Sequence, residues 1–195
     1  LQDVLDLVQE FRVKDAVTPI VLMGYLNPIE IMGYAQFIAS ACEAGVDGVL
    51  IVDMPPAESA ELHGKLQAEG VDTIYLVAPT TSAARASAIT SLSTGYLYYV
   101  SLKGVTGAAL TDHQSVGEKI AALRGLTDLP IVIGFGIKDA ESAQAMGKLA
   151  DGVVIGSALV ERIAKLPAHE LQSSADLQHC TAEIAVVRDA LNQIK

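Results

Sequence analysis

Basic residues are scarce in this chain of 195 residues. Thirteen Lys and Arg stand against 23 Asp and Glu, which gives a formal net charge of −10. Such a field repels nucleic acid and anionic lipid, so the composition argues against both as partners. A phosphorylated small molecule is not excluded, because backbone N–H groups can hold an anion inside an acidic protein.

Long hydrophobic runs and cysteines are also lacking. Hydrophobic residues make up 51% of the chain, yet no run approaches the roughly 18 apolar residues that a membrane-spanning helix needs. The two cysteines, Cys42 and Cys180, lie far apart and lack the spacing of metal ligands. With no secretory leader visible, we expect a cytoplasmic protein without a metal site, in which Cys42 is a small buried residue.

Six short apolar runs recur along the chain, and each ends in Gly, Pro or a polar residue. They lack strict alternation, as expected for parallel strands that are covered on both faces. Helical patterns separate most of them; one has the start signal Asn27-Pro28-Ile29-Glu30 and continues to about Gly45. The apolar runs are residues 20–23, 49–52, 74–77, 96–100, 131–133 and 153–155.

This alternation predicts βαβ units on a parallel sheet, either an open doubly wound sheet or a barrel. No Gly-x-Gly-x-x-Gly follows the first run, which counts against a dinucleotide-binding sheet. We predict an α/β fold with one partial TIM-barrel domain over residues 1–195, and an outer C-terminal helix over residues 175–195. Because Leu1, Val4 and Leu5 already fall at helical spacing without an N-cap, we expect a fragment that opens inside a helix.

Three glycine-bearing segments follow the last three predicted strands. They are Lys103-Gly104-Val105-Thr106-Gly107, Gly134-Phe135-Gly136-Ile137 and Ile155-Gly156-Ser157-Ala158. Glycines let backbone N–H groups bend toward a ligand, Thr106 adds a hydroxyl, and the helix after the last strand adds a favourable dipole. Each segment alone is typical of a simple turn, but together they indicate a phosphate site of the kind that TIM barrels hold.

Apolar side chains at or near the ends of predicted strands form a candidate pocket beside this phosphate site. Aromatic rings there can stack on a flat ligand ring, although ordinary core and rim residues would give the same pattern. The residues are Tyr25, Val52, Tyr98 and Phe135.

Candidates for acid–base chemistry are few. Asp53 directly follows a predicted strand, and it either faces the pocket or caps the helix after Pro55-Pro56. Lys103 could form a Schiff base, but its place in a glycine-rich loop favours an exposed lysine. The histidines lie on predicted helices or beside that loop, where we expect surface residues: His63, His113, His169 and His179.

Four motifs together carry a resemblance to a known family. They are Pro19-Ile20-Val21-Leu22-Met23-Gly24-Tyr25-Leu26-Asn27-Pro28, Gly45-Val46-Asp47-Gly48-Val49-Leu50-Ile51-Val52-Asp53-Met54-Pro55, Gly104-Val105-Thr106-Gly107 and Gly134-Phe135-Gly136-Ile137. In this order, from about Val4 to the C-terminal helix, the chain resembles the tryptophan synthase α-subunit family.

The resemblance implies a (β/α)8 TIM barrel that cleaves indole-3-glycerol phosphate to indole and glyceraldehyde 3-phosphate, a retro-aldol step of L-tryptophan biosynthesis. It implies no cofactor in this subunit, since pyridoxal phosphate belongs to a partner β subunit in an α2β2 heterotetramer. The implied phosphate-binding residues are Thr106, Gly107, Gly136, Gly156 and Ser157. By the same resemblance, Tyr98 and Phe135 border the indole, with Tyr25 and Val52 nearby. Residues 103–110, including Lys103 and Gly104, form a lid. The implied contacts with the β subunit are Asn27, Pro28, Asp53 and Pro55.

The main departure from the family concerns catalysis. There, a glutamate on the second strand and an aspartate in the next loop transfer protons, and both precede the segment that this chain matches. We therefore expect no catalytic residue in this chain, little turnover, and a barrel that lacks about its first two βα units. The exposed sheet edges of such a barrel predict instability, aggregation or dimerisation. Two alternatives stay open: a non-catalytic barrel that binds a phosphate ligand or the β subunit, and another phosphate-binding TIM-barrel enzyme, such as an epimerase or a thiamine-phosphate synthase relative.

Overall fold

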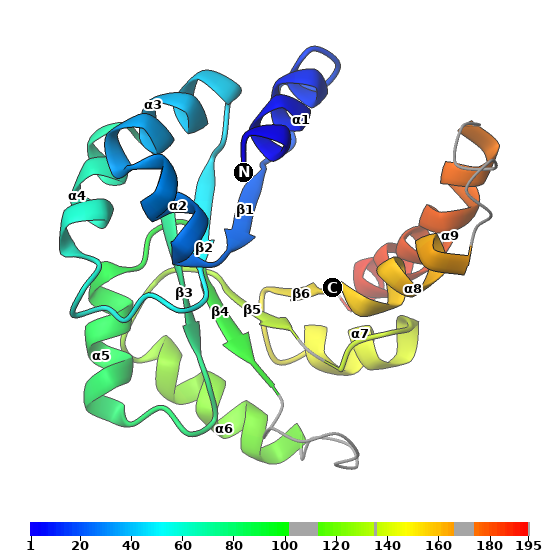
Figure 1. The fold of residues 1–195 in the computed structure, drawn as a ribbon. Coiled ribbons are helices and arrows are strands. Elements are labelled where there is room, and N and C mark those ends of the chain that lie inside the picture. Colours follow the sequence, from blue (N-terminus) through cyan, green and yellow to red (C-terminus); the bar gives the residue numbers. More distant parts are fainter. Residues whose placement is uncertain (102–112, 135, 166–173, 195) are drawn as a thin grey trace. The chain divides into compact units, whose positions relative to one another are not determined.

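The computed structural model describes residues 1–101, 113–134, 136–165 and 174–194 (Figure 1). The chain divides into two compact units. The first contains Leu1–Val77 and Ser82–Leu97, and the second contains Ala78–Thr81 and Tyr98–Lys195. Strands and helices alternate through both units, which confirms the predicted βα rhythm.

The strands follow one another in chain order, β1 to β6. Their bounds differ from the predicted runs by no more than two residues at either end. The strands are β1 (Val21–Gly24), β2 (Gly48–Ile51), β3 (Asp72–Val77), β4 (Leu97–Val100), β5 (Ile131–Gly134) and β6 (Gly152–Val154). The helices are α1 (Gln2–Arg12), α2 (Leu26–Met32), α3 (Tyr34–Ala44), α4 (Ala60–Ala68), α5 (Ala83–Leu92), α6 (His113–Arg124), α7 (Ala140–Gly147), α8 (Ser157–Lys165) and α9 (Ser174–Asn192).

In the first unit, β1, β2 and β3 pair in parallel. The register places Gly24 opposite Ile51 at the carboxyl ends of β1 and β2. Helices α1, α2, α3 and α4 supply most of the buried side chains of one core cluster in this unit, among them Leu5, Phe37 and Leu62. Because the helices cover the strands, β2 is apolar at Val49, Leu50 and Ile51 in succession rather than alternating.

In the second unit, β5 pairs in parallel with β6. Helix α7 packs against α9, where the Gln144 side-chain amide donates to the carbonyl oxygen of Ala190 over 3.3 Å. An ion pair between Arg162 and Glu183 joins α8 to α9. A helix was predicted for residues 175–195, and α9 covers most of them.

The predicted helix from Asn27 to about Gly45 is two helices, and that prediction was wrong. Gly33 lies between α2 and α3 with φ 83° and ψ 138°, a backbone conformation that suits glycine and ends α2. The N-cap of α2 is Tyr25, not Asn27. The start of α4 was also misplaced by the Pro55-Pro56 signal, since turns closed by Glu58 N–H to Pro55 O and by Ser59 N–H to Pro56 O precede it.

Other helix ends follow their sequence signals. Ser82 caps α5 by accepting a hydrogen bond from the Arg85 N–H. Asp139 and Ser142 form a capping box at the start of α7. Within the described ranges, no helix is both long and apolar enough to cross a bilayer.

Candidate functional site

The carboxyl ends of β1 and β2 carry the predicted site residues of the first unit. The Val52 N–H donates to the carbonyl oxygen of Gly24 over 2.9 Å, so the segments after β1 and β2 leave the sheet side by side. Tyr25 and Val52 both project into solvent there, with 64% and 38% of their surfaces exposed. The structure therefore brings these two predicted pocket residues to the same edge of the sheet.

Asp53 has a role that neither sequence interpretation anticipated. Its Oδ1 atom accepts a hydrogen bond from the N–H of Leu26, the first residue of α2, over 2.8 Å. The prediction that Asp53 caps the helix after Pro55-Pro56 was therefore wrong, because the carboxylate turns back to the helix that follows β1. The contact spans 27 residues of sequence, and a local pattern cannot reveal it.

An apolar groove of about 310 Å³ adjoins this edge in the first unit. Tyr25 and Pro28 line it together with apolar residues of β1 and with Ile29 and Phe37, whereas Val52 does not. Asn27 is exposed on the first turn of α2, and Pro55 is half-buried in the loop that follows Asp53. The proposed β-subunit contacts thus belong to the first turn of α2 and to the loop after β2, which the Asp53–Leu26 hydrogen bond joins.

Three of the predicted phosphate-binding residues lie in the second unit. Gly136 follows β5 with φ 76°, the left-handed region that favours glycine. Gly156 follows β6, is exposed, and has no heavy atom within 4 Å of the position that a Cβ would take. Ser157 is the first residue of α8, whose Leu159 N–H already bonds to the Gly156 carbonyl oxygen. A helix N-terminus beside an open glycine suits an anion.

The remaining predicted site residues lie outside the described residues. These are Lys103, Gly104, Thr106 and Gly107 in the glycine-rich loop and Phe135 after β5. Their predicted roles in the lid, the phosphate site and the indole pocket stay predictions.

Tyr98 is buried beside Gly134 rather than exposed at a rim. Only 5% of its surface is exposed, and a Cβ at Gly134 would come within 1.9 Å of its Oη atom. Ser101, also buried, bonds to the Gly134 carbonyl oxygen through its N–H at 3.1 Å and its Oγ at 2.9 Å. These contacts tie the end of β4 to the end of β5. Ser101 was not among the predicted site residues, since its only sequence signal is a polar residue at the end of an apolar run.

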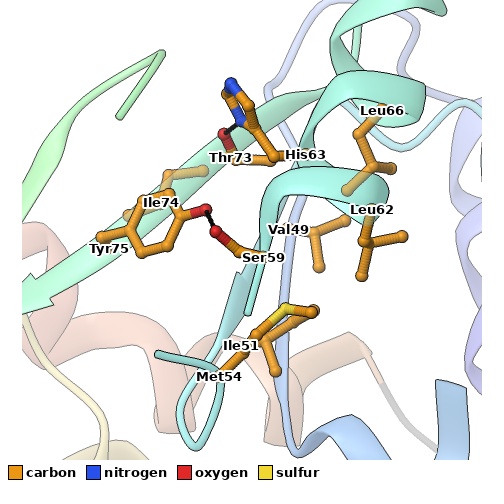
Figure 2. A pocket seen from close by; sticks show the side chains of 10 residues that line it. All are labelled: Val49, Ile51, Met54, Ser59, Leu62, His63, Leu66, Thr73, Ile74 and Tyr75. Atoms are coloured by element: carbon orange, nitrogen blue, oxygen red, sulfur yellow. Dashed lines mark hydrogen bonds between the residues drawn. The ribbon is translucent and has the colours of Figure 1, made fainter. Parts of the chain in front are cut away.

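A small cavity of about 20 Å³ lies beneath the loop between β2 and α4 (Figure 2). Mostly apolar side chains line it, and the Tyr75 hydroxyl donates to Ser59 Oγ over 2.7 Å at its edge. Burial raises the pKa of Tyr75, so its phenol stays a neutral donor. The volume suits one water molecule at most, which makes this a packing cavity rather than a substrate site.

His63 also reaches this cavity, contrary to the expectation of a surface residue. Its Nδ1 atom lies 2.7 Å from Thr73 Oγ1, and both side chains are drawn in Figure 2. The Thr73 hydroxyl also donates a hydrogen bond to the carbonyl oxygen of Leu92 over 3.2 Å. The histidine thus links α4 to β3 and has a structural role.

The described part of the chain shows neither a group of metal ligands nor a reactive thiol. A search of those residues finds no group of three His, Cys, Asp or Glu side chains that could hold a metal ion. Cys42 is half-buried in α3 rather than fully buried. Burial, followed by the nearby Glu69 carboxylate, raises the pKa of the Cys42 thiol and keeps it protonated and unreactive.

Comparisons with known proteins agree over nearly the whole chain. The family model described as tryptophan synthase alpha chain matches residues 1–189. The chain is 55% identical over 188 residues to the tryptophan synthase alpha chain of Methylococcus capsulatus, a match that covers 96% of this chain and 69% of that protein.

Solved structures show the same similarity. The crystal structure of the tryptophan synthase alpha chain from Legionella pneumophila matches with a TM-score of 0.84 and 40% identity, covering 99% of this chain and 70% of that one. A structure of the tryptophan synthase α2β2 complex from Pyrococcus furiosus matches with a TM-score of 0.81 and 32% identity, covering 96% of this chain and 73% of that one. These matches confirm the predicted (β/α)8 TIM-barrel fold class, and they give no support to a different phosphate-binding barrel enzyme.

Proposed function

Because the chain belongs to the family of tryptophan synthase alpha chains, we propose that it acts in the cleavage of indole-3-glycerol phosphate to indole and glyceraldehyde 3-phosphate. This carbon–carbon lyase step supplies indole for L-tryptophan biosynthesis. The observation that carries the proposal for this chain is the open Gly156 before Ser157, at the N-terminus of α8. It offers backbone donors and room for a phosphate.

We assign the substrate phosphate to Gly136, Gly156 and Ser157, with Thr106 and Gly107 as further donors. Tyr25, Val52, Tyr98 and Phe135 are assigned to the indole ring, and Lys103 and Gly104 to a lid. The assignment uses the polarity of the substrate, since the phosphate needs N–H and O–H donors whereas the indole needs apolar surface. The single barrel domain over residues 1–195 belongs to the same proposal.

Proton transfer is a separate requirement of the retro-aldol reaction. C3 of the indole must gain a proton and a glycerol hydroxyl must lose one. The glutamate and aspartate that the family resemblance implies for these steps match no residue of this chain. We therefore assign these 195 residues to substrate binding, without a catalytic residue among them.

The proposed partner is a β subunit that carries pyridoxal phosphate and consumes the indole in the cytoplasm. The similar Pyrococcus furiosus protein was solved as an α2β2 complex. The proposed contacts are Asn27 and Pro28 in the first turn of α2, and Asp53 and Pro55 in the loop after β2. Their mixture of an apolar and a polar surface suits a protein interface. No cofactor is assigned to this chain itself.

Calorimetric titration with indole-3-glycerol phosphate tests the substrate assignment. We expect the wild-type chain to bind it and Gly156→Ala to bind it at least about tenfold more weakly, because a methyl group would take the space of a phosphate oxygen and remove a close backbone approach. Gly64→Ala is the matched control, since a Cβ there also meets no atom within 4 Å and Gly64 lies on α4, which carries none of the proposed site residues. Equal affinity in the two glycine variants, or no binding by the wild type, contradicts the proposal.

A further inference from the structure

The carboxyl ends of β4, β5 and β6 are linked within the second unit through Gly134, the last residue of β5. On one side, the Gly134 carbonyl oxygen accepts from Ser101, the residue after β4. On the other side, the parallel register places Gly134 opposite Val154, the last residue of β6. Each of the three positions lies within two residues of a glycine-bearing segment proposed for the phosphate, namely residues 103–107, 134–137 and 155–158.

The Gly134 carbonyl oxygen receives two hydrogen bonds from the same residue. The Ser101 N–H donates over 3.1 Å, and the Ser101 Oγ donates over 2.9 Å. Only 1% of the surface of Ser101 is exposed, and burial of a hydroxyl costs free energy unless the group is hydrogen-bonded. The Oγ bond is additional to the backbone bond between the two strands, so a substitution of the side chain can remove it alone.

Gly134 needs this second bond because the position must be glycine. A Cβ there would lie 1.9 Å from Tyr98 Oη, so the Tyr98 ring leaves no room for a side chain. Glycine has more backbone freedom than any other residue and loses more of it on folding. Two donors on one carbonyl oxygen hold the ψ angle of Gly134, and with it the direction in which the chain leaves β5 toward Gly136.

We infer that Ser101 is a positioning residue of the phosphate site, an inference that rests on the proposed function above. Its hydroxyl holds the Gly134 backbone. Because β4, β5 and β6 are neighbours in the sheet, this fixes the relative placement of Gly136, Gly156 and Ser157. Several donors bind a phosphate at once, so the affinity depends on how well their directions are fixed before the ligand arrives. Ser101 acts through Gly134 rather than as a phosphate ligand.

The test separates recognition of the phosphate from binding of the rest of the substrate. Calorimetry gives the affinities for indole-3-glycerol phosphate and for indole-3-glycerol, which lacks the phosphate, and their ratio is the phosphate gain. For the wild-type chain we expect a gain of at least about tenfold, because hydrogen bonds to a charged group are stronger than those between neutral groups. In Ser101→Ala the gain falls at least about fivefold, whereas the affinity for indole-3-glycerol stays within about twofold of wild type.

Ser93→Ala is the matched control, because Ser93 makes the same pair of bonds elsewhere in the chain. It is buried, and its N–H and its Oγ each donate to the Ile89 carbonyl oxygen over 2.9 Å. Ser93 follows α5, which carries none of the proposed site residues, so Ser93→Ala keeps the wild-type phosphate gain. Ser101→Cys fills the space of the hydroxyl with a weak donor, lowers the gain as Ser101→Ala does, and replaces it where Ser101→Ala does not fold.

The possible outcomes distinguish the inference from the proposed function. A Ser101 variant that keeps the wild-type phosphate gain overturns the inference while the proposed function stands. An equal fall in the Ser101 and Ser93 variants also overturns it, because the effect then follows from general destabilisation. If the wild type binds neither compound, or binds both equally well, the proposed function fails and the inference fails with it.

Discussion

Arg12, the last residue of α1, forms an ion pair with Asp47, the residue before β2, with Nη2 and Oδ2 2.5 Å apart. The same carboxylate accepts from the N–H of Ile20, just before β1, over 2.6 Å. The second unit repeats this arrangement. There, Arg124 at the end of α6 pairs with Asp151 before β6 at 3.0 Å, and the Asp151 carboxylate accepts from the Ile131 N–H of β5 over 2.8 Å. We call each set of a helix-end arginine and a pre-strand aspartate an Arg–Asp clamp.

We expect the clamp of the first unit to contribute more to the free energy of unfolding than that of the second. The Arg12 side chain is 16% exposed and also donates to the carbonyl oxygens of Gly45 and Thr18, whereas Arg124 is 45% exposed. We expect Asp47→Ala to lower the free energy of unfolding by about 1–3 kcal/mol, since it leaves a poorly solvated guanidinium and a backbone donor without the carboxylate. Asp151→Ala costs less, about 1 kcal/mol, because its partner is better solvated. Urea denaturation measures both, and equal losses would contradict the ranking.

The capping box of α7 gives a pH-dependent contribution. The hydrogen bond from the Ser142 hydroxyl, followed by that from its N–H, lowers the pKa of Asp139 below the ordinary 3.8. A lowered folded-state pKa stabilises the fold above the unfolded value and loses this effect as pH falls through the folded value. Asp139→Ala therefore costs about 1 kcal/mol at neutral pH, and the difference from wild type shrinks below about pH 4. The urea midpoints of the two proteins at several pH values check this.

The matched control for this prediction is Asp128→Ala, because Asp128 is an exposed aspartate in the loop before β5. It removes the same charge without removing a helix cap. A difference between wild type and Asp139→Ala that stays constant from pH 7 to pH 2 would show that the carboxylate contributes no charge-dependent capping.

Gly134 has no room for a side chain, in contrast to Gly156. A Cβ at Gly134 would lie 1.9 Å from the Tyr98 hydroxyl oxygen and 2.3 Å from its Cζ atom. We expect Gly134→Ala to destabilise the second unit by about 1–3 kcal/mol through overpacking, which lowers Tm by at least about 2 °C. Gly156→Ala is the control, and it keeps the wild-type Tm while it weakens phosphate binding. Identical melting of the two variants would argue against the Tyr98 contact.

The Ser59–Tyr75 hydrogen bond is a testable buried polar pair. Ser59→Ala leaves the Tyr75 hydroxyl without its acceptor beside a cavity of about 20 Å³, so we expect a loss of about 1–3 kcal/mol. In Ser59→Ala/Tyr75→Phe no hydroxyl is left unsatisfied, and part of the loss is recovered. A double-mutant cycle from urea denaturation gives the pairwise energy. An energy of zero would mean that a cavity water replaces Ser59 fully.

Local sequence patterns predicted the strands well because each strand is short, apolar and ended by a helix-start or turn residue. The capping box at Asp139, whose partners lie within three residues, is a local feature of the same kind. Such reasoning failed at α2, where Asn27-Pro28-Ile29-Glu30 carries a good local signal but the N-cap residue is Tyr25, and the side chain that accepts from the Leu26 N–H is Asp53, 27 residues away. It also missed Gly33, since a positive φ at a single glycine interrupts a helix without any change in the apolar pattern.

Local sequence patterns predicted fewer features of the candidate site than of the strands. Gly156 and Ser157 were predicted from a helix start after a strand, and the structure places them there. Ser101 could not be predicted, because its bonds to Gly134 cross from one strand to the next over 33 residues. His63 was misjudged for the same reason, since its partner Thr73 lies on β3. Contacts between elements depend on packing, which a single strand or helix pattern does not encode.

The recurrence of the Arg–Asp clamp has an evolutionary consequence. Asp47-Gly48-Val49 and Asp151-Gly152-Val153 have the same three residues where β2 and β6 begin. Each aspartate bonds to the start of the strand that comes before it in the chain, and to the helix that precedes that strand. A segment of this kind contains the residues that attach its strand to the sheet, so a duplicated copy can pair with an existing strand without compensating substitutions elsewhere. Gene duplication of such a segment therefore adds strands to a parallel sheet with few further substitutions. Two copies of the Arg–Asp clamp are what such a duplication would leave in the sequence.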